Sequence, residues 1–213
     1  EIFLAGAFFA LLALDLFVAN KKWIGWLAFF SLAAALFIRP PFYPAEEKIF
    51  FDYFVLDPFT DFFKLAALGA AALAILSALA FEKIPRKQEG EFYLLLLALA
   101  LLLTFMGGAV NLLMIFLTIE SVSLVSYLLV GFQKFDKRSS EAALKYVLFG
   151  AVASALMLFG MSLLFGVTGS IWLSQIGAYA HTAGGGNQAM LLVGLLFLLA
   201  GILLGSFVGF VLG

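Results

Sequence analysis

The chain has 213 residues, of which 65% are hydrophobic and 12% are charged, and its mean hydropathy is +1.14. This composition excludes a soluble globular domain, and the continuous apolar runs favour membrane-spanning helices over the alternating strands of a barrel. The net charge of −1 gives no basis for binding nucleic acid or for a polybasic lipid-binding surface. Because there is no cysteine and only one histidine, we expect no iron–sulfur, haem or zinc site, and no other cofactor, in this chain.

Runs of about 17–25 apolar residues predict seven spans, and the fold class is therefore an all-α, polytopic transmembrane helical bundle. In chain order the predicted spans are 2–19, 23–38, 60–81, 91–108, 111–131, 140–166 and 189–212. Segment 39–59 combines prolines with aromatic and acidic residues, which indicates an external loop and an interfacial segment. Gly107 and Gly108 predict a tight hairpin, and the sequence HTAGGGNQ at 181–188 predicts a flexible external loop.

The first and last residues of the chain both lie in apolar runs, EIFLAGAFFALLALDLF at the start and AGILLGSFVGFVLG at the end. Neither run has a polar exit, and no basic segment with a small-residue cleavage site marks a signal peptide. We therefore expect both ends to have been cut from a longer protein.

The basic residues are distributed unequally between the two sides of the predicted bundle. Eight of the twelve fall in the loops after the first, third and fifth spans: Lys21, Lys22, Lys83, Arg86, Lys87, Lys134, Lys137 and Arg138. By the positive-inside rule, loops 20–22, 82–90 and 132–139 are cytoplasmic and the N-terminus is outside.

Glu120 is an acidic residue in the middle of the apolar run from Asn111 to Gly131. It lies about 14 Å from one end of this run and about 16 Å from the other, at roughly 1.5 Å per residue. An ionisable side chain near the bilayer centre costs on the order of 3 kcal/mol, and proton or ion handling is the usual reason for it. Ser123 and Tyr127 follow on the same helix face, so they are secondary candidates for a proton path. The alternative is a protonated glutamic acid that only bonds to a neighbouring helix.

Lys145 is the second charged residue inside a predicted span. Ser140 is a plausible N-cap, which places Lys145 about 7.5 Å into the helix, where a lysine can snorkel to the surface. Glu141 lies four residues before it, in the favourable order for a helical ion pair. The spacing alone supports a functional role and a structural role equally.

Other polar residues and glycines carry weaker signals. Asp15 lies near the cytoplasmic end of the first span and is interpreted as an interfacial or packing residue, and His181 as a solvated loop residue. The last span contains a glycine every four residues, at Gly201, Gly205, Gly209 and Gly213. Such a stripe allows close helix packing, or a helix break at Gly205 or Gly209 that lines a water cavity.

Three stretches carry a resemblance to a known family. They read EFYLLLLALALL, NLLMIFLTIESVSLVSYLL and SSEAALKYVLFGAVASALMLFGMSLLFGVTGS, in that order. They resemble the N-type antiporter-like subunit of respiratory complex I, the proton-pumping NADH–quinone oxidoreductase, and FVLDPFTDFFK is also similar to it. The resemblance covers nearly the whole chain and implies the first part of an inverted-repeat fold. Residues 1–90 would hold three N-terminal helices, and 91–213 would begin the first antiporter-like repeat.

The resemblance also assigns roles to individual residues. Glu120 matches the family's membrane-buried glutamate, which is thought to control the protonation of a partner lysine, and Lys145 matches a lysine of the sixth helix. The seventh helix of the family carries a further lysine, but alignment places Gly205 at that position, and no lysine follows Lys145. The chain therefore departs from the family in its last span, and it lacks the second inverted repeat.

The resemblance implies a proton-translocating, non-redox subunit coupled to quinone reduction elsewhere in the complex. FMN, iron–sulfur clusters and quinone would belong to other subunits, and the partners would be antiporter-like and small helical membrane subunits in a bacterial inner membrane. One alternative is a subunit of a related cation/proton antiporter or membrane-bound hydrogenase. The other is a structural spacer without its own proton path.

Overall fold

The computed structural model describes residues 1–18, 20–38, 47–49, 52–80, 88–182 and 184–212. Its helices are α1 (Ile2–Phe17), α2 (Lys22–Phe37), α3 (Pro58–Ala80), α4 (Glu89–Gly107), α5 (Leu112–Val130), α6 (Lys137–Thr168), α7 (Leu173–Thr182) and α8 (Gly185–Leu212). Each of the seven predicted spans is confirmed as a helix, with ends that differ by a few residues. The helical fold class is therefore correct, and among the described helices α7 is the one that was not predicted.

The predicted loops contain more regular structure than expected. Strands β1 (Glu47–Ile49) and β2 (Phe54–Leu56) form an antiparallel pair inside the predicted loop 39–59, of which 39–46 and 50–51 lie outside the described residues. The prediction of a flexible loop at 181–188 is wrong, because α7 ends at Thr182 and α8 begins at Gly185. The predicted cytoplasmic segments 20–22 and 132–139 each include the first residues of a helix, and most of 82–90 is outside the described residues.

Five of the described helices are long and apolar enough to cross a membrane by length and composition: α3, α4, α5, α6 and α8. Helices α1 and α2 are apolar but have 16 residues each. At 1.5 Å per residue they are about 24 Å long, which is less than the roughly 30 Å of a typical hydrocarbon core. The chain is thus an integral membrane protein with two shorter apolar helices at its start.

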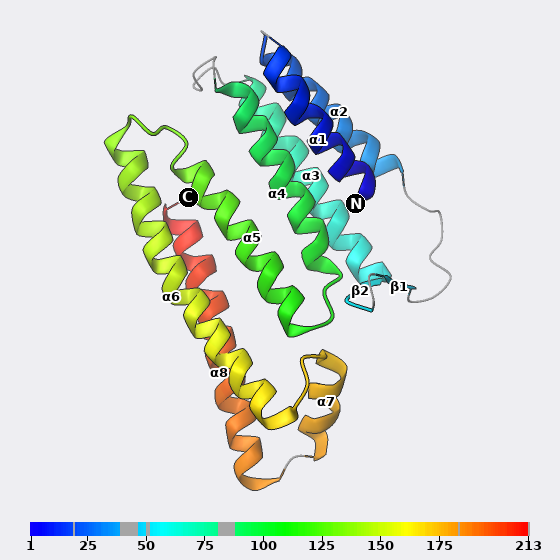
Figure 1. The fold of residues 1–213 in the computed structure, drawn as a ribbon, viewed down its shortest axis with the longest axis vertical. Coiled ribbons are helices and arrows are strands. Elements are labelled where there is room, and N and C mark those ends of the chain that lie inside the picture. The colour runs from blue at the N-terminus through cyan, green and yellow to red at the C-terminus, as the bar shows by residue number, and fades with distance from the viewer. Residues whose placement is uncertain (19, 39–46, 50–51, 81–87, 183, 213) are drawn as a thin grey trace. The chain divides into compact units, whose positions relative to one another are not determined.

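The chain divides into two compact units, Glu1–Ala109 and Val110–Gly213. In the first unit, α1 to α4 pack side by side (Figure 1) around fully buried apolar side chains, among them Ile24, Leu32, Ile75 and Leu97. Helix α4 belongs to the first unit, so the boundary between the two units, after Ala109, falls later in the chain than the boundary predicted between residues 90 and 91. The predicted boundary marks the start of the family repeat and stays a prediction.

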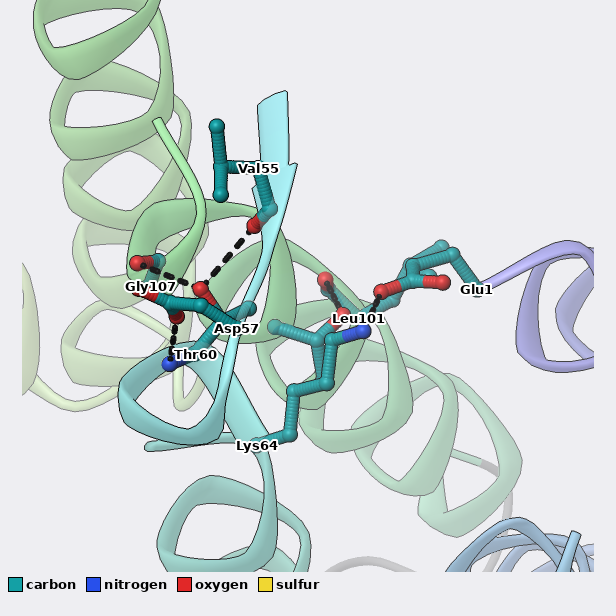
Figure 2. Close-up of polar contacts among 8 residues, drawn as sticks. Glu1, Val55, Asp57, Thr60, Lys64, Leu101 and Gly107 are labelled. Carbon is teal, nitrogen blue, oxygen red and sulfur yellow. Dashed lines mark hydrogen bonds and ion pairs between the residues drawn. The ribbon is translucent and has the colours of Figure 1, made fainter. Parts of the chain in front are cut away.

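A threonine joins three segments at one end of the first unit (Figure 2). Asp57 Oδ1 accepts a hydrogen bond from the backbone N–H of Thr60 at 2.7 Å, which satisfies a donor in the first turn of α3. The Thr60 hydroxyl lies 3.0 Å from the carbonyl oxygen of Val55 and 3.3 Å from that of Gly107. The first residues of α3 are thereby tied to β2 and to the end of α4.

Lys64 lies one turn further along α3 and forms an ion pair with Glu1 (Figure 2). Both side chains are largely buried, and with Asp61 and Thr104 they line a cavity of about 170 Å³. The remaining lining is mostly apolar.

In the second unit, α6 and α8 form the most extensive helix pair (Figure 1). The buried apolar core of this unit comprises Leu112, Met157, Met161, Leu164, Ile176 and Leu191. Gly169 ends α6 in the left-handed conformation, with φ of 65°, which a glycine adopts without steric strain. The chain can then turn directly into α7.

The glycines of α8 determine how closely it approaches α6. A Cβ atom at Gly201 would lie 2.4 Å from Met157 Cγ and 2.6 Å from the carbonyl oxygen of Ala153, so no larger residue fits there. At Gly205, by contrast, a Cβ would be 3.6 Å from Ala153 Cβ, an ordinary contact. Helix α8 is continuous through Gly205 and Gly209. The structure shows no break at these two residues, so their helix-break role stays a prediction, and close packing against α6 holds at Gly201 but not at Gly205.

We predict that Gly201→Ala lowers the melting temperature of the full-length protein in detergent, whereas Gly205→Ala does not. Forcing a methyl group against Met157 and the Ala153 carbonyl should cost about 1–3 kcal/mol, as overpacking does elsewhere. The matched variant adds the same methyl group where there is room. Equal melting temperatures for the two variants would contradict this account of the α6–α8 contact.

Candidate functional site

Glu120 lies near the middle of α5 and is hydrogen-bonded to α6. The Ser154 hydroxyl donates to Glu120 Oε2 at 2.6 Å, a length typical of a hydroxyl bound to a carboxylate. The two residues are 34 positions apart in sequence, so the bond depends on the packing of α5 against α6. Both residues are only partly buried. The carboxyl group is thus held between two helices inside a span.

Tyr127 lies about two turns further along the same face of α5. Its ring meets that of Tyr146 of α6 edge-on, with 4.6 Å between the ring centroids. A Cβ at Gly150 would lie 1.9 Å from the Tyr127 hydroxyl oxygen, so the hydroxyl group occupies a space that only glycine leaves open. Ser123 interacts with Tyr127 through its side chain. The predicted stripe of Glu120, Ser123 and Tyr127 does lie along the contact with α6.

Lys145 is not brought to Glu120. Its ammonium group pairs with Glu141 Oε1 at 2.5 Å, and the two side chains are 52% and 64% exposed. Lys145 precedes Ser154, the partner of Glu120, by nine residues, which corresponds to about 13.5 Å along the helix axis. The geometry is that of a helical ion pair on the outer face of α6.

The start of α6 also differs from the prediction. Asp136 is the N-cap, and its side chain accepts from the backbone N–H of Arg138 at 3.0 Å. The predicted cap, Ser140, instead lies inside the first turns and donates to the carbonyl of Lys134. Lys145 is therefore about 13.5 Å from the N-cap, deeper in the helix than the predicted 7.5 Å.

The remaining candidates have structural environments. Asp15 Oδ1 lies 3.0 Å from the Lys21 ammonium group, and a Cβ at Gly90 would collide with this carboxylate, so Asp15 packs tightly where α1 meets α4. His181 is an exposed residue in the last turn of α7. Within the described part of the chain, no three histidine or acidic side chains gather into a set that could hold a metal ion.

Ser154 and Tyr146 were not among the residues predicted from the sequence. Together with Gly150 they recur every four residues, so they share the face of α6 that meets α5. A search of the helix after Glu120 for small and hydroxyl-bearing residues at this spacing would have found them. The structure thus adds a second polar row, on α6, to the row predicted on α5.

Residues 109–210 match a family model described as NADH:quinone oxidoreductase/Mrp antiporter, transmembrane region. NADH-quinone oxidoreductase subunit N of Anaeromyxobacter sp. (strain Fw109-5) is 39% identical over 185 residues, which cover 84% of this chain and 35% of that protein. The protein of the same name from Trichlorobacter lovleyi is 34% identical over 205 residues, which cover 95% of this chain and 42% of the relative. The chain thus spans about two fifths of the length of these curated relatives.

The solved structures agree with the sequence matches. A chain of respiratory complex I from Thermus thermophilus with bound aureothin superposes with a TM-score of 0.72 and 29% identity, over 94% of this chain and 42% of that chain. An archaeal membrane-bound sulfane sulfur reductase gives a TM-score of 0.73 at 18% identity, which shows the fold alone. The chain is therefore similar to the antiporter-like membrane subunits of NADH–quinone oxidoreductase, and in particular to the N-type subunit.

Proposed function

We propose that the chain is part of a proton-translocating subunit of NADH–quinone oxidoreductase, in which buried charged residues move protons while quinone is reduced elsewhere in the complex. The observation that carries this proposal is the carboxyl group of Glu120, which lies inside an apolar span and is bonded across helices to Ser154. Because the chain spans 35% and 42% of two such relatives, the activity belongs to a longer protein.

In this proposal Glu120 takes up and releases the proton, and Ser123, Tyr127 and bound water lead to it. A unit charge that approaches to about 6 Å, at an effective dielectric constant near 20, changes the energy of a carboxylate by nearly 3 kcal/mol. That is enough to change the occupancy of a proton site about a hundredfold. Movement of one charge nearby could therefore load or unload Glu120.

Lys145 is proposed as the relay partner of Glu120. In the structure it pairs with Glu141 on an exposed face, so the relay requires this ion pair to open and the lysine side chain to turn toward the α5–α6 contact. An exposed ion pair opens at little energetic cost because water replaces the partner. Neighbouring subunits in the assembled complex would exclude this water and so change the energy needed to open the ion pair.

The remaining parts of the proposal concern the assembly. FMN, iron–sulfur clusters and quinone would reside in other subunits, and the chain would contact antiporter-like and small helical membrane subunits in a bacterial inner membrane with its N-terminus outside. The similarity to chains of multi-subunit membrane complexes supports this assignment.

Replacing the acid tests the proposal directly. We expect Glu120→Gln, in the full-length protein within its native complex in liposomes, to abolish most proton pumping while the complex still assembles, since glutamine cannot release a proton. The ratio of protons pumped to NADH oxidised is the measurement. If the ratio is unchanged, Glu120 has no part in the proton path and the chain is a spacer.

The role of Lys145 can be separated from that of its ion pair. A relay predicts that Lys145→Ala lowers the same ratio severalfold, whereas Glu141→Gln, which breaks the ion pair but keeps the lysine, leaves it close to wild type. Both variants remove the pair, so each controls for the other. Equal ratios in the two variants would show that Lys145 acts only as an ion-pair partner.

A cation/proton antiporter subunit is the second candidate, because the description of the matching family model includes Mrp antiporters. It predicts that pumping requires sodium and is accompanied by sodium movement in the opposite direction. Proton pumping of equal rate in sodium-free buffer would exclude it.

A further inference from the structure

We propose that Ser154 is a positioning residue for Glu120: its hydroxyl group holds the carboxylate against α6, in the position from which Glu120 exchanges its proton. This inference rests on the proposed role of Glu120. It assigns to a neutral side chain of α6 the task of stabilising the charge on α5.

The position of Ser154 is fixed from two sides. Its hydroxyl donates to Glu120 Oε2 at 2.6 Å, and its neighbour Ala153 is buried against α8. A Cβ at Gly201 of α8 would lie 2.6 Å from the Ala153 carbonyl oxygen, so the two helix backbones are in close contact at this level. The close α6–α8 contact therefore fixes the segment of the α6 backbone that carries the donor.

No cation in the described chain takes the place of this donor. On α6, Lys145 is paired with Glu141, and Tyr146 meets Tyr127 of α5. Helix α8, from Gly185 to Leu212, contains no titratable side chain. On α7, Tyr179 and His181 are the titratable residues. This helix lies at the N-terminal end of α5, where Ile176 of α7 and Leu112 of α5 belong to one buried cluster.

A hydroxyl donor stabilises the ionised form of a carboxyl group more than the protonated form. Removing the Ser154 hydroxyl therefore takes away a contact that favours the ionised form. Hydrogen bonds to charged groups have a net strength that corresponds to a shift of roughly one to two pH units. The midpoint of a process that requires ionised Glu120 should move upward by that amount.

The test uses Ser154→Ala in the full-length protein within its native complex in liposomes. We expect NADH oxidation to persist and the midpoint of the pH profile of pumping to rise by about one unit or more. Ser154→Thr keeps the hydroxyl and should retain the wild-type midpoint.

Ser162→Ala is the matched control, because the Ser162 hydroxyl donates to the carbonyl oxygen of Phe159 in its own helix, on an exposed face. If Ser154→Ala does not assemble, Ser154→Cys, a weak donor, should shift the midpoint in the same direction.

The outcomes separate this inference from the proposed function. If Glu120→Gln blocks pumping but Ser154→Ala or Ser154→Cys has the wild-type profile, the role of Ser154 is overturned and that of Glu120 stands. If Glu120→Gln pumps normally, both are overturned. An equal shift in Ser162→Ala, or a threonine variant that behaves like alanine, would also overturn the inference. A shift confined to Ser154→Ala and Ser154→Cys supports it.

Discussion

A carboxyl group inside an apolar helix needs a hydrogen-bond donor, because the surrounding hydrocarbon supplies none. In this chain, Ser154 of α6 provides that donor for Glu120 of α5. The site therefore exists only where the two helices pack in the observed register. A slip of one residue along either helix would turn the hydroxyl away by about 100° and leave the acid without this partner.

The backbone of α6 that carries Ser154 is itself held by the contact between α6 and α8. Gly201 lets the backbone of α8 approach Ala153, the residue directly before Ser154. Between membrane helices there is little hydrophobic driving force, so such small-residue contacts supply much of the association energy. Gly205, one turn further, leaves room for a side chain.

The spans and the polar stripe could be predicted from sequence because both follow from spacing along one helix. The apolar runs gave seven helices, and the spacing from Glu120 to Tyr127 gave one shared face. Ser154 could not be identified as the partner, since its relation to Glu120 depends on the register between two helices. The cap at Asp136 was missed because serine and aspartate both cap helices and Ser140 lies closer to the apolar run. Helix α7 was missed because it is short and of mixed polarity.

The most direct test of the central claim is to observe proton exchange at Glu120 during turnover. Infrared difference spectra of the intact complex, recorded as quinone reduction is started, report the carbonyl stretch of a protonated carboxyl group. The account predicts a carboxyl band that appears or disappears with turnover in the wild type and is missing in Glu120→Gln. A spectrum that is identical in the two proteins would show that Glu120 keeps one protonation state, and would contradict the account.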